Sequence, residues 1–465
     1  MLRVYNTLTG QKEKFEPLHA PDVHMYACGI TVSGEAHIGH AYQALIYDII
    51  RRYLVKCGYH VTYARNYTDV DDKIIASANR AGIDATTYAE RMIENIDGQM
   101  RRLEVGDPDV WLRATQHIGD IIEFVKELIA TGHAYATPKG DVYFAVDSYA
   151  GYGHLSNRNL EDAKVGVRID PDEEKRDALD FALWKSAKKG EIFWHSPWGD
   201  GRPGWHIECS CMNRAAFGEQ IDIHGGGRDL IFPHHENEIA QTESLTGKTF
   251  AKYWFHNGLI KVNGQKMSKS LGNSLLLKDL LDAYGPETIK FALLQNNYRQ
   301  DINVTDNLFP DADRQMTDFY KVIADVKRAF PDEEDVDPTV DLAFNEAMDD
   351  DFNTAKALSD LFGLFKRVKA ALAAGDPAAA RIVNGVVSSY SLLGLFTKDP
   401  ATVVASYAAK HAVVVPDEVK AIAERRFEAK KAKDWATADA LRAELTALGW
   451  AVKDSKEGYT LSPLE

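Results

Sequence analysis

The stretch 232–241, FPHHENEIAQ, places two histidines and two glutamates within five positions and suggests a metal site. The zinc-protease motif HExxH is absent, because Ile239 stands four residues after His235. His234 and Glu238 are four residues apart, so on a helix both side chains would lie on one face, with Cβ atoms about 6 Å apart. This pair could hold a metal if other ligands converge on it.

The string His37-Ile38-Gly39-His40 is a candidate phosphate site. It lies at a predicted junction between a loop and a helix, where free backbone N–H groups attract anions and Gly39 lets a phosphate approach closely. By itself the string is weak evidence, because residues 117–120 read HIGD within an ordinary amphipathic helix pattern. The position after a predicted strand favours the first string.

Two lysines of the segment 266–270, KMSKS, form a second candidate for phosphate chemistry. Lys266 and Lys269 lie in a predicted loop flanked by glycines, where they could neutralise charge that develops on a phosphate during its transfer. Taken alone, a solvated turn explains this segment equally well.

Four cysteines are too few to cross-link a chain of this length, so we expect reduced thiols or metal ligands. Cys28 ends a predicted strand, and Cys209 could join it at the histidine–glutamate pair, because the strand ends of a parallel sheet converge on its ligand crevice. Cys209 and Cys211 do not form a CxxC pair, which argues against a zinc ribbon. Cys57 and Cys211 are expected to be buried apolar residues.

The elements that must position these residues follow from the apolar pattern. The segment 23–29 alternates and ends in glycine, which predicts a strand that feeds a loop. Apolar residues recur at helical spacing over 40–57, and 58–66 predicts another strand. This β-loop-α-β unit is typical of a parallel nucleotide-binding sheet. A second α/β stretch runs from 221–227, IDIHGGG, to 253–264, YWFHNGLIKVNG.

The rest of the chain predicts three further parts. Residues 119–200 mix helix patterns with a loop-rich run and predict an inserted subdomain between the two α/β stretches. After about residue 310 the apolar residues recur at helical spacing, which predicts an all-helical domain. The fold class is therefore α/β, a Rossmann-type parallel-sheet catalytic domain with an inserted subdomain, followed by an all-helical domain and a small mixed C-terminal appendage.

The composition is that of an ordinary globular protein, with 45% hydrophobic and 26% charged residues over 465 positions. The formal net charge of −15 argues against nonspecific binding to nucleic acid, which depends on Lys and Arg. One basic segment, 421–433, is either a solvated helix face or a nucleic-acid contact through Arg425, Arg426 and Lys430. Because neither a signal peptide nor an apolar run of about 18 residues is found, we expect a cytoplasmic protein without a membrane segment.

HIGH and KMSKS, in this order, resemble the motifs of class I aminoacyl-tRNA synthetases. Longer motifs resemble one family of that class, the cysteinyl-tRNA synthetases, from about residue 4 to 361: VYNTLTG, YACGITV, NYTDVDDKI, LWK, SPWGDGRPGWHIECS, IDIHGGGRDLIFPHHENEIAQ, KMSKSLGN and DDDFNTAKAL. The resemblance implies that ATP activates L-cysteine to cysteinyl adenylate with release of pyrophosphate. The cysteine is then transferred to the 3′ terminal adenosine of tRNA(Cys). We further expect one Zn²⁺ per chain, Mg²⁺ with ATP, and a monomer.

The resemblance also assigns roles to residues that match the family motifs. Zinc is expected to select the substrate thiolate, because it binds a thiolate strongly and a hydroxyl poorly, whereas pocket shape separates cysteine from serine only weakly. His235 and Glu236 are expected not to be ligands and to point elsewhere, either to positions behind the ligands or to the ATP side. The implied site residues are His37, His40, Lys266 and Lys269 for catalysis; Cys28, Gly29, Thr68 and Trp205 for cysteine; His37, Gly39, His40, Gly226, Gly227, Asp229 and Lys269 for ATP; and Cys28, Cys209, His234 and Glu238 for zinc.

The implied division of the chain has five parts. They are 1–118, the first half of the catalytic domain with HIGH; 119–200, the inserted subdomain; 201–260, the second half with the zinc ligands; 261–310, the KMSKS stem-contact region; and 311–465, the helical anticodon-binding region with a small C-terminal subdomain.

The chain departs from the family pattern at four places. SGEA stands at 33–36, where an aromatic and acidic stretch is usual, and Tyr42 replaces the arginine that commonly follows HIGHA. Both positions bear on contacts with ATP and the tRNA acceptor end. Ala76 stands where a second lysine is common, which argues against a pyridoxal-phosphate-dependent persulfide activity. The C-terminal tail, GYTLSPLE, lacks the tryptophan and the terminal arginines frequent in bacterial members.

Two other functions fit parts of the sequence. A ligase of the mycothiol pathway, which joins activated cysteine to an amino sugar, resembles the same family but would not need the domain after residue 310. A paralogue that has lost catalysis and only binds RNA or a protein partner is opposed by the intact HIGH and KMSKS motifs. Asp69, Asp71 and Asp72 are expected to cap a helix rather than to bind magnesium.

Overall fold

The structure is a computed structural model that describes residues 1–158, 174–267, 274–410, 415–455 and 458–464. The chain forms two compact units, Met1–Thr397 and Lys398–Glu465, and each is described by itself. Among the described residues, no helix is both long enough and apolar enough to cross a membrane.

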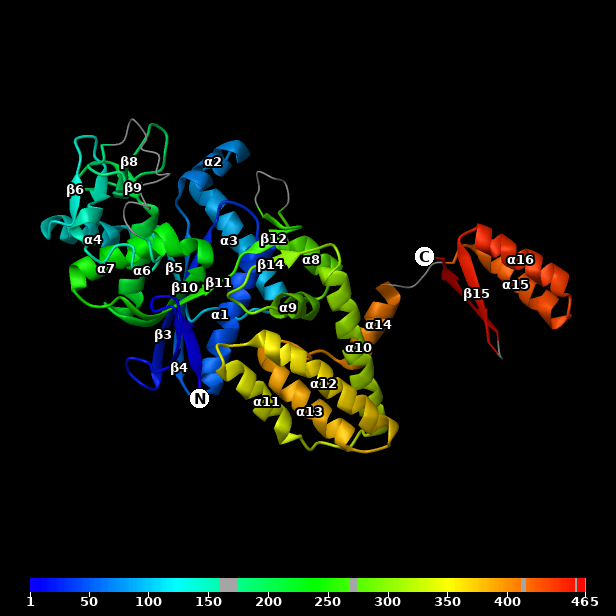
Figure 1. The fold of residues 1–465 in the computed structure, drawn as a ribbon. Coiled ribbons are helices and arrows are strands. Elements are labelled where there is room, and N and C mark those ends of the chain that lie inside the picture. The colour runs from blue at the N-terminus through cyan, green and yellow to red at the C-terminus, as the bar shows by residue number, and fades with distance from the viewer. Residues whose placement is uncertain (159–173, 268–273, 411–414, 456–457, 465) are drawn as a thin grey trace. The chain divides into compact units, whose positions relative to one another are not determined.

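A five-stranded parallel sheet forms the centre of the first unit (Figure 1). Its strands in spatial order are β11 (Ala251–Asn257), β10 (Ile221–Gly227), β3 (Asp22–Thr31), β4 (His60–Thr68) and β5 (Val110–Arg113). On one side β3 pairs with β4, which follows it in the chain, and on the other with β10, which comes from the second α/β stretch. The strand order therefore reverses at β3, and ligands of open α/β sheets bind at such a point. The predicted Rossmann-type sheet is confirmed.

Helices cover this sheet because its strands are buried on both faces. Helix α1 (Ile38–Lys56) connects β3 to β4 and packs against β4. Helix α6 (Trp205–Phe217) packs on β3, β4 and β5, where Tyr26 and Cys28 share a buried cluster with Cys209. The HIGH string and the cysteines are thus placed on elements that meet at one sheet.

Of the three aspartates after β4, one caps a helix. The Asp71 side chain accepts a hydrogen bond from the backbone N–H of Lys73 and begins α2 (Asp72–Ala81), which is followed by α3 (Ala85–Arg102). Asp69 instead accepts the backbone N–H and the hydroxyl of Thr115, and Asp72 forms an ion pair with Arg202. The capping prediction is confirmed for Asp71 and wrong for Asp69.

The inserted subdomain contains a four-stranded antiparallel sheet. Helix α4 (Ile118–Ala130) precedes it and shares its apolar core, which includes Phe124, Phe144 and Trp184. The strands are β6 (Ala134–Ala136), β7 (Val142–Phe144), β8 (Phe181–Ser186) and β9 (Gly201–Pro203). The subdomain leads directly from β9 into α6 and so to the candidate site.

A small three-stranded sheet carries the described start of the KMSKS segment. Its strands are β13 (Gln265–Lys266), β12 (Ile260–Val262) and β14 (Ile302–Val304), and the helices between them are α8 (Leu277–Ala283) and α9 (Pro286–Leu294). Backbone hydrogen bonds of 2.9 Å join Ile38 N to Leu275 O and Leu277 N to Ala36 O. Lys278 of α8 also lies 3.0 Å from Glu35 of the SGEA segment. The chain that returns from KMSKS is therefore fastened to the HIGH loop.

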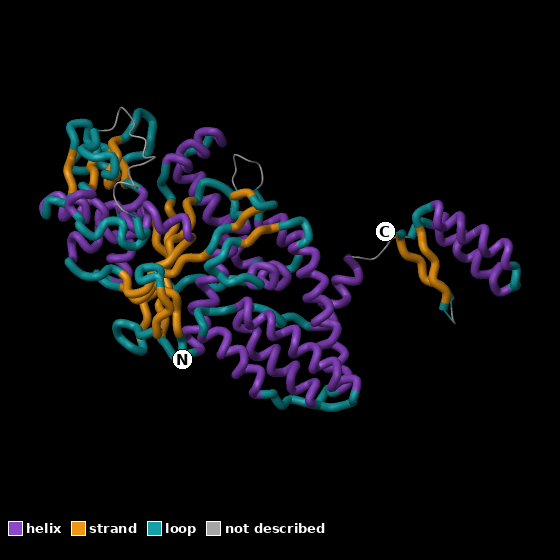
Figure 2. The backbone as a smooth tube through the Cα atoms, viewed as in Figure 1, coloured by secondary structure: helices purple, strands orange, loops and turns teal. Residues whose placement is uncertain are grey.

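From residue 308 to 397 the described chain is helical apart from its connections (Figure 2). The helices are α10 (Leu308–Ala329), α11 (Pro338–Asp349), α12 (Thr354–Ala373) and α13 (Ala378–Tyr390). Asp351, fully buried between α11 and α12, accepts hydrogen bonds from Tyr5 N, the Tyr298 hydroxyl and Arg299 Nε. Tyr5 lies in the hairpin β1 (Arg3–Asn6) and β2 (Gln11–Lys14). One carboxylate thus links the N-terminal hairpin, the end of α9 and the helical layer.

The described residues of the second unit form three helices and a hairpin. They are α14 (Pro400–Lys410), α15 (Asp417–Lys431), α16 (Trp435–Ala447), β15 (Trp450–Asp454) and β16 (Tyr459–Pro463). The Arg426 guanidinium is buried and donates to both carboxylate oxygens of Asp454 at 2.8 and 3.0 Å, while Lys430 lies 2.7 Å from the same carboxylate. Two of the three basic residues expected as nucleic-acid contacts therefore also hold α15 to the hairpin, and the contact with nucleic acid stays a prediction.

Candidate active site

The HIGH string begins α1 at the carboxyl end of β3. The His37 side chain accepts a hydrogen bond from Gly39 N at 3.2 Å, and the His40 ring accepts one from His37 N at 3.4 Å. The two imidazoles stack with their centroids 3.5 Å apart. In the similar string at 117–120, the His117 ring instead pairs with Asp120 and makes no capping bond. Only the first string gathers two imidazoles around a helix N-terminus, which is suited to an anion.

A pocket of about 670 Å³ opens at the carboxyl ends of β3, β10 and β11. The expected site residues on its wall are Gly29, His37, Gly39, His40, Trp205, Gly227 and Asp229, together with Met267 beside Lys266. Lys266 contributes its backbone to β13, and Lys269 lies outside the described residues. Thr68 and Gly226 do not line the wall that the structure describes; Gly226 instead lies against the His235 ring. Residues expected to contact phosphate and residues expected to contact cysteine thus line one pocket.

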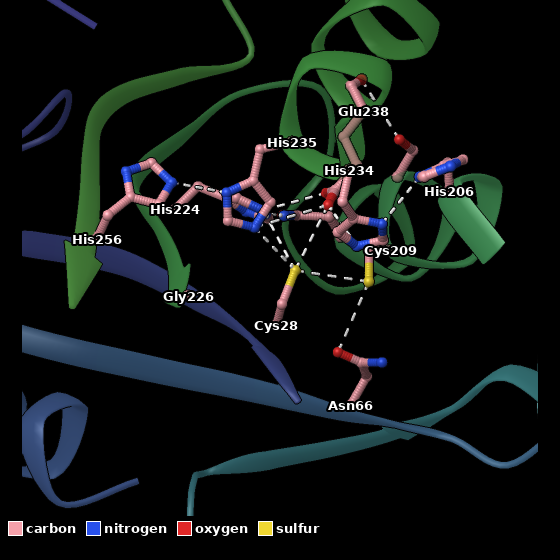
Figure 3. Close-up of polar contacts among 12 residues, drawn as sticks. Cys28, Asn66, His206, Cys209, His224, Gly226, His234, His235, Glu238 and His256 are labelled. Carbon is pink, nitrogen blue, oxygen red and sulfur yellow. Dashed lines mark hydrogen bonds and ion pairs between the residues drawn. The ribbon is translucent and has the colours of Figure 1, made fainter. Parts of the chain in front are cut away.

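Four buried side chains converge beside this pocket, and we call Cys28, Cys209, His234 and Glu238 the outer set (Figure 3). Cys28 Sγ lies 3.6 Å from Cys209 Sγ and 3.4 Å from Glu238 Oε1, which is 2.9 Å from His234 Nε2. Ligand atoms around a tetrahedral zinc, at bonds of about 2.0 to 2.3 Å, lie roughly 3.3 to 3.8 Å apart. Two thiols, an imidazole and a carboxylate at such spacings could hold a metal.

Three segments bring these ligands together. Cys28 ends the regular part of β3, whose pairing with β4 shifts register between Ala27 and Ile30. The Gln43 amide of α1 donates to Cys28 O at 2.7 Å, so the HIGH helix holds the strand that carries the thiol. Cys209 comes from α6. His234 lies in the short segment Ile231–His235, which is interrupted by extended backbone at Phe232 and leads into α7 (Glu236–Thr246) and Glu238.

The outer set favours one positive charge, on His234 or on a bound metal ion, beside the negative charges of Glu238 and Cys209. Burial raises the pKa of Glu238, but His224 and His234 outweigh burial and hold that pKa well below its usual range. Burial lowers the pKa of His234, yet the neighbouring Glu238, followed by Cys209, raises it to about 10. A hydrogen bond from Cys28 lowers the pKa of Cys209 to about 6. Without metal, protonated His234 supplies the cation, and a metal ion would replace that proton.

Three histidines lie behind the outer set, and the sequence argument missed two of them, His224 and His256. His235 Nε2 is 3.3 Å from Cys28 Sγ, so of the two expected positions His235 takes the one behind the ligands and not the one on the ATP side. His224 Nε2 lies 3.1 Å from Glu238 Oε2, and His256 Nε2 lies 2.8 Å from His235 Nδ1. Cys28, His224, His235 and Glu238 form a second buried group within metal-ligand range, which we call the inner set.

Glu236 does point away from the cluster, as expected. Its carboxylate accepts the backbone N–H groups of Gly153 and Ser156 at 2.8 and 2.9 Å, which fastens the inserted subdomain to α7. Trp205, by contrast, lines the pocket and stacks on the His234 ring, with centroids 4.2 Å apart and an interplanar angle of 25°. Trp205 therefore connects the outer set to the space that a substrate would occupy.

Comparison with protein families assigns most of the chain. Residues 14–314 match the model described as tRNA synthetases class I (C) catalytic domain, residues 343–397 the DALR domain, and residues 413–460 the Cysteinyl-tRNA ligase anticodon binding domain. The chain is 45% identical to the cysteine–tRNA ligase of Geobacter sulfurreducens, covering 99% of both chains. It is also 45% identical to that of Pseudomonas paraeruginosa, again over 99% of both.

Solved structures of other synthetases share the fold. The Agrobacterium radiobacter LeuRS in its ternary complex with tRNA aligns with a TM-score of 0.60 and 10% identity over 86% of both chains. The Mycobacterium tuberculosis methionyl-tRNA synthetase with methionyl-adenylate aligns with a TM-score of 0.54 and 16% identity over 84% of this chain and 86% of that one. At these identities the likeness concerns the fold alone.

Proposed function

Because this chain belongs to the cysteine–tRNA ligase (cysteinyl-tRNA synthetase) family, and is an ATP-dependent aminoacyl-tRNA ligase, we propose that it charges tRNA(Cys) with L-cysteine selected through a zinc-bound thiolate. The observation that carries this proposal is the outer set beside the pocket that begins at the HIGH helix. Tetrahedral zinc suits two thiolates, an imidazole and a carboxylate. Glu238 Oε2, buried and without a hydrogen-bond partner among the described residues, also fits a metal.

In the proposed first step, the carboxylate oxygen of cysteine attacks the α-phosphorus of ATP, the bond to the β-phosphate breaks, and pyrophosphate leaves with Mg²⁺. His37 and His40, at the N-terminus of α1, would hold the α-phosphate as charge develops on it. Lys266 and Lys269 would hold the leaving pyrophosphate. A hydroxyl of the terminal adenosine then attacks the carbonyl carbon of the adenylate, AMP leaves, and cysteine is esterified to the tRNA.

Selection of cysteine over serine rests on the outer set. Bound zinc would lower the pKa of the substrate thiol and hold the thiolate, for which a hydroxyl is a poor substitute. Trp205, Gly29 and Thr68 would enclose the amino acid, with Trp205 stacked on the ligand His234. Gly226, Gly227 and Asp229, at the end of β10, would border the nucleotide. We expect a monomer that acts in the cytoplasm, where its substrates are found.

The experiment that tests this proposal compares two cysteines. Cys28→Ser should abolish stoichiometric zinc and cysteine-dependent ATP–pyrophosphate exchange, whereas the same substitution at the exposed Cys57 should preserve both. In the parent protein, X-ray absorption should show one additional sulfur on zinc when cysteine is added and none with serine. Full zinc retention in Cys28→Ser, or an unchanged sulfur count with cysteine, would contradict the proposal.

The matches also bear on the two alternative functions. A ligase that uses an amino sugar has no need of an anticodon-binding segment, and residues 413–460 match that segment of the family. A paralogue without catalysis has no need of the HIGH pocket. Aminoacylation with labelled cysteine and total tRNA separates the three, because only the proposed function yields charged tRNA.

A further inference from the structure

We propose that the inner set, Cys28, His224, His235 and Glu238, is a second coordination position for the zinc ion, which shares Cys28 and Glu238 with the outer set and holds the ion away from the substrate pocket. This inference rests on the proposed zinc site. It starts from the distances: Cys28 Sγ lies 3.3 Å from His235 Nε2 and 3.7 Å from His224 Nε2. Glu238 lies 3.1 Å from His224 and 3.9 Å from His235. These spacings are close to the roughly 3.3 to 3.8 Å of tetrahedral zinc ligands.

The surroundings of His224 leave its Nε2 free to bind a metal. Asn213 Nδ2 lies 3.1 Å from His224 Nδ1, while Asn213 Oδ1 is buried without a partner among the described residues. The oxygen and nitrogen of an amide can be exchanged in a structure, and with them exchanged Oδ1 accepts the Nδ1–H of His224. The Nε2 lone pair then faces Glu238 Oε2 at 3.1 Å. Either a proton or a metal ion must lie between two such acceptors, and a bound metal ion would take the place of the proton.

His235 is oriented in the same way by a second chain of contacts. The His256 ring lies 2.8 Å from Thr7 Oγ1 through Nδ1 and 2.8 Å from His235 through Nε2. When the Thr7 hydroxyl accepts from His256 Nδ1–H, His256 Nε2 accepts from His235 Nδ1–H. His235 Nε2 is then unprotonated and faces Cys28 (Figure 3). Hydrogen bonds of this kind to the distal ring nitrogen are usual for metal-binding histidines.

Both positions are buried, and charge distinguishes them. One thiolate and one carboxylate of the inner set balance a divalent ion, and both histidines are fully buried, so the complex is neutral where no water can screen it. The outer set adds a second thiolate and lies under Trp205, which lines the pocket. Because Cys28 and Glu238 are common, a shift between the positions exchanges Cys209 and His234 for two imidazoles without releasing the ion.

Two matched variants test the inner position. His234→Ala removes only an outer ligand and His224→Ala only an inner ligand, and both histidines are buried. The full-length proteins are stripped of metal, reloaded with Zn²⁺ or Co²⁺, and measured for metal content and by X-ray absorption. We expect about one ion per chain in each. The ion should have one sulfur and two imidazole nitrogens in His234→Ala, and two sulfurs with one imidazole in His224→Ala. The double variant should bind at least about 100-fold more weakly than either.

The inference is overturned if His234→Ala loses the ion as Cys28→Ser does, or keeps it with two sulfurs. If His234→Ala does not fold, by circular dichroism and thermal melting, Cys209→Ala decides, because two imidazoles on its ion support the inner position and one overturns it. A parent protein without stoichiometric zinc would instead contradict the proposed function itself, so the two failures are distinguishable.

Discussion

Gly29, the residue beside the proposed zinc ligand Cys28, allows a sharp test of how the sheet positions that thiol. Gly29 N donates to Asn66 Oδ1 at 2.9 Å, and an added Cβ at Gly29 would lie 1.5 Å from Asn66 O and 2.6 Å from its carbonyl carbon. Real Cβ atoms essentially never lie within 3.0 Å of such atoms. Both partners are backbone, so in Gly29→Ala the strands β3 and β4 must separate locally by about 1.5 Å.

The magnitude of the effect follows from that displacement. A metal ligand must stay within about 0.2 Å of its bonding distance, so the neighbouring Cys28 would leave the coordination shell. Overpacking of a well-packed core costs about 1 to 3 kcal/mol, and a clash between two backbones falls at the upper end. Gly29→Ala should therefore lose stoichiometric zinc and cysteine-dependent pyrophosphate exchange, and should melt at a lower temperature than the parent.

The matched control is the same substitution at Gly119, where an added Cβ meets nothing within 4 Å. Gly119 lies in the first turn of α4, in the string that resembles HIGH, and alanine there should raise helix stability by about 0.5 to 1 kcal/mol. Zinc content by mass spectrometry, thermal melting and exchange activity are measured on both variants. Parental zinc affinity and melting temperature in Gly29→Ala would refute the reasoning from the β3–β4 contact.

Three further predictions concern contacts outside the pocket. Asp351→Ala should destabilise the first unit by about 3 to 5 kcal/mol in denaturant titrations, because it leaves several buried hydrogen-bond donors without an acceptor. Asp351→Asn should destabilise it less, because asparagine tolerates the φ of 65° at this position. Arg426→Ala should destabilise the second unit by about 1 to 3 kcal/mol. Arg426, then Lys430, hold the pKa of Asp454 well below its usual range. The stabilisation of the second unit by this ion pair is therefore present above about pH 4 and is lost as the pH falls and Asp454 becomes protonated. Asp454→Asn should remove this pH dependence in acid unfolding. Glu35→Lys breaks the ion pair with Lys278 and should slow adenylate formation, measured by pyrophosphate exchange, about threefold to tenfold. Adding Lys278→Glu restores an ion pair of reversed sign and should restore most of the rate. If the rate is not restored, the ion pair has no part in adenylate formation.

The pattern of apolar residues predicts those helices and strands that have one or both faces buried in the core. The segments expected at 23–29, 40–57 and 58–66 correspond to β3, α1 and β4, because long strands and a helix at the centre of a sheet leave a strong periodic signal. The pattern is wrong for Cys57. It predicts a buried thiol, but α1 ends at Lys56 and Cys57 is exposed. Helix ends project beyond the core, and periodicity does not show where the core stops.

The candidate site is predictable where its geometry is local and not where it depends on strand pairing. The four-residue spacing of His234 and Glu238 predicts their contact, which the structure shows at 2.9 Å. His224 and His256 join them only because β10 lies beside β11, with Gly226 opposite His256. A histidine inside the buried strand IDIHGGG is the local hint of His224. Likewise, charge in the 421–433 segment does not reveal that Arg426 meets Asp454 across the hairpin.

Because of the strand order in the central sheet, β3 is synthesised on the ribosome long before its partner β10. Strand β3 is complete at Thr31, but its partner β10 begins at Ile221, 190 residues later. At about 5 to 20 residues per second, one edge of β3, with Cys28, waits on the order of 10 to 40 s for its neighbour. An unpaired edge of an apolar strand is prone to pair with other chains during that time. The nascent N-terminal half is therefore the stage at which aggregation is the greatest risk, and the strand that carries Cys28 is the one left with an unpaired edge.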